Sequence, residues 1–224
     1  MIGPIQPHRR ALARGIAALA LFAVVVTAGA WYYHHRGGSA VWRAASDDPN
    51  GRLLAAADLG DSTSGVARET LVRLAGDASV AVAVQAVQSL GRNVCPANRE
   101  AMSSLLTSPH LRPEARAEAL AEMGRFPDAD PHPLIAALAA DDDARIRAGA
   151  AMGLTRLRNP AALPELSRRL EDPDPRVRIW AITGIHRMIT RRFPYDAKAD
   201  PATQAAVIRK IRTYLRSCGV KGIE

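Results

Sequence analysis

Aromatic residues are scarce in this sequence: Phe, Trp and Tyr together make up only 4% of its 224 residues. Nearly half of the chain, 48%, is nevertheless hydrophobic, and much of that share is alanine. Alanine has the highest helix propensity, and its small side chain lets neighbouring backbones approach closely. No stretch alternates between apolar and polar residues in the way a half-buried strand does. The composition therefore predicts helices packed on helices.

The sequence also lacks the short motifs of common enzymes and metal sites. It contains no nucleophile elbow, no glycine-rich phosphate loop and no HExxH pair. Its two cysteines, Cys95 and Cys218, belong to no CxxC or His/Cys cluster, which argues against a zinc site. We therefore expect no enzymatic activity, no catalytic residues, no cofactor and no metal ion.

Charge is distributed very unevenly along the chain, although the formal net charge is only +8. Residues 1–44 contain five arginines and no acidic residue. Residues 45–144 contain 8 basic and 15 acidic residues, a net −7, whereas residues 145–224 contain 17 basic and 7 acidic residues, a net +10. Such asymmetry indicates a polyanionic partner, head-to-tail self-association, or simply a solvated charged surface.

The N-terminal region has the pattern of a membrane segment. Residues 1–14 form a basic tail, and no charge occurs from Gly15 to Tyr33, a length that nearly spans a bilayer core as a helix. Residues 15–35 are predicted to be a transmembrane helix of a single-pass inner-membrane protein, with the bulk of the chain extracytoplasmic, that is periplasmic. The alternative is a signal peptide cleaved near Ala30, which would leave a secreted or periplasmic protein.

After a predicted linker at residues 36–50, one pattern occurs four times, with apolar or small residues at offsets zero, four, five and eight. The residues at offset zero are Val82, Ala115, Ile146 and Val177, at intervals of 33, 31 and 31 residues. The residues at offset four are Ala86, Ala119, Ala150 and Ala181. These offsets lie on one face of a helix. Between the copies lies a second, leucine-rich set that predicts a second helix in each unit.

A helical hairpin of this kind cannot bury its apolar side alone, so the units are expected to stack into a continuous core. The stretches "DDDARIRAGAAMGLTRL" and "DPDPRVRIWAITGIHRM", with two weaker copies, resemble HEAT-like repeats, specifically the short class named after phycobilin lyases. The resemblance implies an all-α fold: a right-handed α-solenoid of about four to five hairpins with capping helices over residues 51–218. The transmembrane helix predicted from the uncharged N-terminal segment would precede it.

An arginine stands ten residues after position zero in every unit. The four are Arg92, Arg125, Arg156 and Arg187. Stacking would align them in one column, with Arg145, Arg176 and Trp180 beside its C-terminal half. Arginine in the last turn of a helix satisfies free carbonyls and complements the helix dipole. The same column could bind an acidic partner, with Trp180 as an aromatic anchor, and the sequence leaves both interpretations open.

Two further features have structural interpretations. Asp141, Asp142 and Asp143 precede a predicted helix and match the acidic turn of the next unit, which favours capping over calcium binding. Cys95 and Cys218 lie about three repeats apart, and stacked hairpins advance about 10 Å each. This separation exceeds the reach of a disulfide, so none is expected within the chain.

Because repeat folds serve many functions, the repeat itself does not reveal the chemistry. The sequence favours a non-catalytic, membrane-anchored scaffold that binds an acidic or peptide-like protein, with residues 15–35 in the bilayer. The alternative is a binder of an anionic polymer or nucleic acid through the basic C-terminal half, although export argues against nucleic acid. A lyase-type enzyme has no support beyond the shared repeat. The oligomeric state and the partner's identity stay open.

Overall fold

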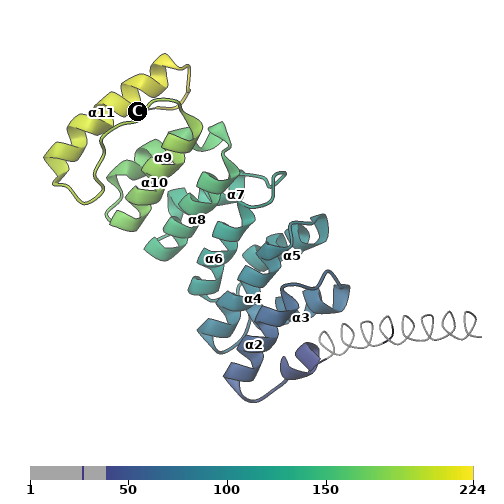
Figure 1. The fold of residues 1–224 in the computed structure, drawn as a ribbon. Helices are drawn as coiled ribbons and strands as arrows, with labels where there is room; N and C mark the ends of the chain where they lie inside the picture. The colour runs from purple at the N-terminus through teal and green to yellow at the C-terminus, as the bar shows by residue number, and fades with distance from the viewer. Residues whose placement is uncertain (1–26, 28–38, 224) are drawn as a thin grey trace, which may run out of the picture.

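The computed structural model describes residue 27 and residues 39–223, and every regular element in the second range is helical (Figure 1). A short helical segment at residues 39–43 comes first. The elements that follow are α2 (Pro49–Leu59), α3 (Gly65–Ala75), α4 (Val80–Arg92), α5 (Pro96–Thr107), α6 (Pro113–Met123), α7 (His132–Ala140), α8 (Ala144–Leu157), η1 (Pro160–Ala162), α9 (Leu163–Arg168), η2 (Arg169–Glu171), α10 (Pro175–Met188) and α11 (Pro201–Ser217).

The helices form two layers. Helices α2, α4, α6, α8 and α10 pack side by side in chain order, and we call them the stacked layer. Helices α3, α5, α7 and α9 form the second layer, and each packs more extensively on the helix that follows it than on the one before. A second-layer helix therefore pairs with the stacked-layer helix that follows it, as α3 does with α4, whereas the units expected from the sequence pair it with the helix before it. The result is an all-helical, solenoid-like stack, with α11 at the opposite end from α2 (Figure 1).

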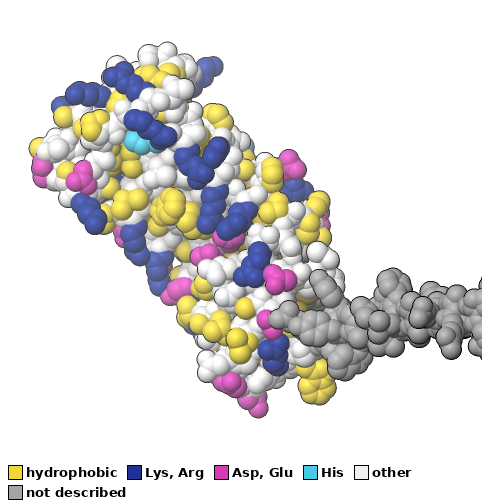
Figure 2. Space-filling view, in the orientation of Figure 1, with side chains coloured by type: hydrophobic (Ala, Val, Ile, Leu, Met, Phe, Trp, Pro, Cys, Tyr) yellow, Lys and Arg dark blue, Asp and Glu magenta, His cyan; other side chains and the backbone are white. Residues whose placement is uncertain are grey.

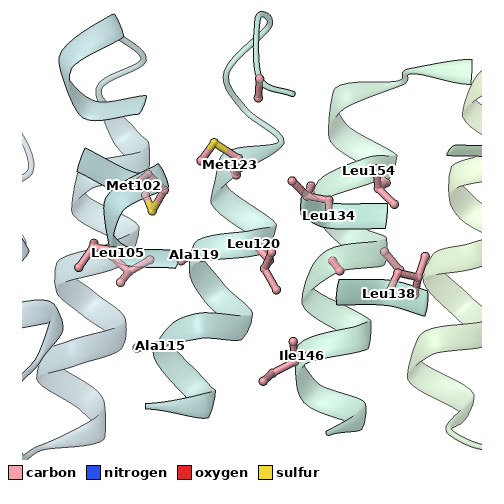
Figure 3. Close-up of a cluster of buried hydrophobic side chains, with 14 of the residues drawn as sticks. Met102, Leu105, Ala115, Ala119, Leu120, Met123, Leu134, Leu138, Ile146 and Leu154 are labelled. Atoms are coloured by element: carbon pink, nitrogen blue, oxygen red, sulfur yellow. The ribbon is translucent and has the colours of Figure 1, made fainter. Parts of the chain in front are cut away.

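The repeated positions form the core, as predicted. Every residue at offsets zero, four, five and eight of the four copies is buried. Figure 3 shows how Leu120 and Met123 of α6 and Leu154 of α8 lie among leucines and methionines of the second-layer helices, including Leu105 and Leu134. Because each helix contributes only one apolar face, burial requires the neighbouring repeat.

Helix α2 belongs to the same repeat, which the sequence pattern alone did not reveal. Gly51 lies 31 residues before Val82, and Ala55, Ala56 and Leu59 are buried at offsets four, five and eight. Because Gly51 replaces the apolar residue at offset zero, the repeat pattern is difficult to recognise in the sequence of α2. Helix α2 is thus the fifth helix of the stacked layer, in agreement with the upper limit of the expected four to five hairpins.

An arginine at offset one links successive turns in two of the units. Arg52 donates to both carboxylate oxygens of Asp77, at 2.7 and 3.0 Å, and Arg147 does the same to Asp172, at 2.9 and 3.0 Å. Each arginine also donates to two carbonyl oxygens in the turn before its own helix. The hydrogen bond from Arg52 lowers the pKa of Asp77 below its ordinary value. These bidentate pairs tie the turn of one repeat to the turn of the next.

Helices α6 and α8 approach so closely that glycine is required between them. A Cβ atom on Gly149 would overlap the backbone of Ala117, and one on Gly153 would overlap the carbonyl oxygen of Leu120. The repeat pattern predicted a close approach only at offset four, where Ala150 is fully buried. The glycines at offsets three and seven set the spacing just as directly.

The residues before α2 are folded onto the stack. Ala40 and Ala44 are buried, and Arg73 donates to the carbonyl oxygen of Ala44 at 3.2 Å. The part of the predicted linker that the structure describes, residues 39–50, is therefore docked rather than extended. The predicted transmembrane segment, residues 15–35, lies outside the described residues apart from residue 27. Within the described part of the chain, no helix has the length and apolar character needed to cross a bilayer.

Helix α11 covers the last repeat as predicted. Its buried residues include Ile208, Ile211 and Leu215. The Asp200 side chain caps its N-terminus by accepting hydrogen bonds from the backbone N–H groups of residues 202 and 203. The loop before it is held by Tyr195, whose hydroxyl donates to the carbonyl oxygen of Leu170 at 2.5 Å. Both cysteines are free thiols.

Candidate functional site

The four arginines at offset ten occupy equivalent places at one end of the stacked layer, and we call them the arginine ladder. Arg92, Arg156 and Arg187 lie in the last turns of α4, α8 and α10, and Arg125 follows the C-cap of α6. The first three arginines of the ladder surround one shallow hollow of about 290 Å³. Its lining residues are Gln88, Arg92, Glu118, Glu122, Arg125 and Arg156.

Glu122 occupies the centre of the ladder and neutralises two of its members. Its carboxylate is almost fully buried and lies 2.5 Å from Arg125 Nε and 2.8 Å from Arg156 Nη1. Arg156 also donates to the carbonyl oxygen of Ala121 at 2.7 Å. Arg156 therefore caps the C-terminal end of α6, in the preceding repeat, rather than its own helix. The capping interpretation describes this arginine well.

Arg92 is held more loosely. Its guanidinium lies 3.4 Å from the carboxylate of Asp61, and both side chains are largely exposed to solvent. Exposed ion pairs of this kind contribute little to stability. The pair nevertheless places a carboxylate next to the first arginine of the ladder, so each of the first three ladder members faces an acidic side chain.

Arg187 differs from the other members of the ladder. It is exposed, and its side chain makes no hydrogen bond or ion pair with any residue in the described range. The residue equivalent to Glu122 in the next repeat, 31 positions later, is Gly153, where a side chain would overlap Leu120. Close packing of α6 and α8 therefore removes the carboxylate that would have neutralised Arg187.

Arg145 and Arg176 lie at the other end of α8 and α10, not within the ladder. Arg145 Nη2 is 2.7 Å from Asp143 and also pairs with Glu114, and Arg176 Nη2 is 2.8 Å from Asp174. These guanidinium groups lower the pKa values of the two aspartates, which cap the helices on which the arginines lie. Eleven residues of helix, about 16 Å, separate Arg176 from Arg187.

Trp180 lies between these two rows on α10. It is half-buried against the core, one turn beyond Arg176 and two turns before Arg187. Its backbone carbonyl accepts a hydrogen bond from the Thr155 hydroxyl at 3.2 Å, which joins α10 to α8. The neighbouring Ile179 is exposed, at 41%, and it adds apolar surface beside Trp180.

The remaining polar candidates have structural roles. Asp141 and Asp143 accept backbone hydrogen bonds in the turn before α8, as expected for capping. His186 accepts a hydrogen bond from the Phe193 N–H at 3.1 Å, and burial, assisted by Arg192, lowers its pKa. Over residues 39–223, His, Cys, Asp and Glu side chains form no cluster of three that could hold a metal ion.

Figure 2 displays the charge pattern on this face. Lys and Arg side chains gather over the C-terminal half, from α8 to α11, whereas Asp and Glu side chains alternate with them toward α2. Basic and acidic residues, which are unevenly distributed along the sequence, are therefore unevenly distributed on this face of the folded protein as well. The face changes from a mixed-charge surface to a basic one along the stack.

A match to a known protein family supports the repeat assignment. Residues 100–186, from α5 to α10, match the family of HEAT repeats. The chain has no significant match among curated proteins. Among solved structures, an engineered protein from the Northeast Structural Genomics Consortium has a TM-score of 0.49 and 19% identity, over 80% of this chain and 88% of that one. A designed armadillo repeat protein has a TM-score of 0.44 and 17% identity, over 83% of this chain and 94% of that one. The assignment to the phycobilin-lyase class stays a prediction, whereas the HEAT-like character of the repeats is supported by the family match.

Proposed function

We propose that this protein is a non-catalytic HEAT-like scaffold that binds an acidic or peptide-like segment of another protein. Residues 15–35 would anchor it in the inner membrane as a single pass, with the solenoid on the extracytoplasmic side. The repeats form an extended surface on a rigid stack, which suits binding of a partner segment along several helices.

The observation that carries the proposal is the difference in neutralisation along the ladder. Arg187 has no carboxylate partner among the described residues, and Trp180, with Ile179 beside it, lies two turns before it on the same helix. Aromatic residues and arginine are enriched where binding energy is concentrated in protein interfaces. A partner carboxylate could pair with Arg187 without displacing an internal one. We therefore assign partner binding to the α10 end of the stacked layer, and helix capping to Arg156.

Charge reversal of one residue tests this assignment. Membranes solubilised from cells that produce the tagged full-length protein would be used for affinity purification, with proteins identified by mass spectrometry. Arg187→Glu should abolish recovery of the specific partner, because it places a carboxylate against an acidic segment. Lys221→Glu, an equal charge change at an exposed residue away from α10, should leave recovery unchanged.

Both variants must melt like the wild type for this comparison to hold. We expect this of Arg187→Glu because the exposed Arg187 side chain makes no hydrogen bond or ion pair in the described range that its loss would break. Recovery of the same partner by a folded Arg187→Glu protein would remove the ladder from the binding site. A shared loss in both variants would mean that overall charge, rather than this site, attracts the partner.

Topology is tested separately. Alkaline phosphatase fused after Glu224 should be active if the solenoid is exported, because the enzyme requires the oxidising compartment. An inactive phosphatase fusion together with an active cytoplasmic reporter at the same position would contradict the orientation. Sequencing the N-terminus of the mature protein then distinguishes a retained anchor from cleavage near Ala30.

A further inference from the structure

A second hollow lies on α11, away from the ladder. It has a volume of about 480 Å³ and lies between helix α11 and the loop that joins α10 to α11. Its lining residues are Arg191, Ala206, Arg209, Lys210, Thr213, Tyr214 and Ser217. Their spacing places the α11 members on one face of the helix, and Arg191 reaches the same hollow from the loop.

The lining contains three cationic side chains and three hydroxyl groups but no carboxylate. Residues 187–221 contain nine basic and two acidic residues, a net +7. The two acidic residues are engaged locally: Asp196 accepts a hydrogen bond from the Lys198 N–H, and Asp200 caps α11. No acidic side chain therefore competes for the hollow within this segment.

Arg191 is held in place without being neutralised. Its guanidinium carbon lies 5.2 Å from the ring centroid of Phe193 and 5.6 Å from that of Tyr214. The two rings pack edge to face at 5.6 Å, and Phe193 is buried. Cation–π contacts orient a guanidinium while leaving its N–H groups available to a ligand. Arg191 therefore combines a fixed position with an uncompensated charge.

The other arginines of the C-terminal half are mostly used internally. Arg212 also lies on α11, but it pairs with Glu171 at 2.8 Å, and Arg178 donates to backbone carbonyl oxygens. The side chains of Arg209 and Lys210 make no ion pair or hydrogen bond with any residue from 39 to 223. The fold thus satisfies the cations that face the core and leaves the cations of this hollow without partners.

We infer that this hollow binds a phosphate group carried by a larger molecule. Guanidinium groups bind phosphate oxygens in a bidentate manner, and an ammonium group adds a point charge. The Ser217 hydroxyl already donates to the carbonyl oxygen of Tyr214 at 2.7 Å. The three cations alone supply more donors than one carboxylate can accept, whereas a phosphate presents three or more oxygens. The volume exceeds that of a free phosphate and leaves room for the group attached to it. The attached group could be a soluble phosphoester or a lipid headgroup.

The test uses two probes and two matched double variants of the full chain. Calorimetric titration with inorganic pyrophosphate measures binding of a soluble phosphate. Co-sedimentation with vesicles of phosphatidylglycerol in phosphatidylcholine, and with phosphatidylcholine alone, measures binding to a lipid phosphate. The site variant is Arg209→Gln with Lys210→Gln, and the control is Lys198→Gln with Lys221→Gln, which removes the same charge outside the hollow.

The wild type should bind at least one of the two phosphate probes, and the site variant should lose about tenfold or more in affinity. The control should change the affinity by less than about twofold, an effect of long-range charge alone. Binding of pyrophosphate without vesicles would assign a soluble ligand, and site-dependent binding of anionic vesicles would assign a lipid headgroup.

Three outcomes would overturn the inference. The first is failure of the wild type to bind either probe. The second is an equal loss in the site variant and the control, which would show diffuse attraction rather than a site. The third is tighter binding to poly-glutamate than to pyrophosphate with the same dependence on Arg209 and Lys210, which would identify an acidic protein as the occupant.

Discussion

Arg156 and Arg187 stand at the same position of adjacent repeats but have different surroundings. Arg156 bonds the buried carboxylate of Glu122 and a carbonyl oxygen of α6. For Arg187, the position equivalent to Glu122 is occupied by Gly153, which has no carboxylate, and the Arg187 side chain is exposed. The position of an arginine within its repeat therefore determines where its side chain lies. Whether that side chain is neutralised depends on the residue that faces it from the preceding repeat.

The two halves of the stack nevertheless share one stabilising device, the arginine at offset one. Arg147 and Asp172 are nearly buried, with 10% and 0% of their side chains exposed. Arg147→Ala would leave the Asp172 carboxylate buried without its bidentate partner, and we expect a loss of about 2–3 kcal/mol in the free energy of unfolding. Urea denaturation followed by circular dichroism measures the change.

The same substitution in the N-terminal half, Arg52→Ala, should destabilise the protein less, because that pair is more exposed to solvent. If Arg147→Ala unfolds at the wild-type urea concentration, the turn-to-turn pairs contribute nothing to the stack. The comparison between the halves would then rest on the ladder alone.

We attribute the absence of a carboxylate beside Arg187 to the close packing of α6 and α8 at Gly153. The substitution Gly153→Ala tests this explanation. The added methyl group would overlap the Leu120 carbonyl oxygen, so we expect a loss of about 1–3 kcal/mol. Gly65→Ala is the matched control, because a Cβ there meets only the end of the Arg68 side chain at 3.5 Å. A glycine-to-alanine change in open helix is neutral or stabilising.

Thermal melting of both variants, together with urea denaturation, gives the two free-energy differences. Equal behaviour of Gly153→Ala and Gly65→Ala would show that α6 and α8 can separate at no cost. In that case, the absence of a carboxylate beside Arg187 would not follow from packing.

Neutral substitutions within the ladder separate capping from binding. Arg156→Gln should cost about 1–2 kcal/mol, because it leaves Glu122 and the end of α6 with weaker partners. Arg187→Gln should stay within about 0.5 kcal/mol of the wild type, as for an exposed side chain without contacts. Urea denaturation of the two proteins in parallel measures the difference, and equal losses would contradict the assignment of different roles.

The smallest expected effect concerns pH and the end of α10. Burial lowers the pKa of His186, and its neutral ring accepts the Phe193 N–H, so the unfolded chain binds a proton more readily than the folded one. Stability should therefore fall as pH drops through the unfolded histidine pKa of about 6.5. His186→Gln keeps an acceptor but cannot titrate in this range, so its melting temperature should depend less on pH between about 7.5 and 5. An unchanged pH dependence would show that His186 does not carry this effect.

Much of the fold followed from the sequence because its evidence is periodic. Ala86, Ala119, Ala150 and Ala181 recur at one helical offset, and each is fully buried. A helix that repeats one apolar face at a fixed interval has few ways to bury it other than stacking on copies of itself. The positions of the ladder and the capping role of Asp143 and Asp174 followed by the same reasoning.

Other features could not be read from the pattern. The fifth copy in α2 was concealed because Gly51 replaces an apolar residue at offset zero. The docking of Ala40 and Ala44 was missed because alanine in a polar stretch resembles a linker until a neighbouring surface covers it. The hollow on α11 depends on Arg191, whose place is decided by two aromatic rings distant in sequence from one another.

The sequence by itself determined the helical class, the repeat interval and the faces that are buried, because helix periodicity and burial are local consequences of residue order. Only the tertiary structure decided which charges are neutralised. An ion pair depends on atoms brought within about 4 Å, and for Arg145 and Arg156 the partner carboxylate comes from the preceding repeat, about 31–34 residues away in the chain. The sequence could therefore place Arg156 and Arg187 in one column, but only the contact of α6 with α8 makes one of them structural and leaves the other open to a partner.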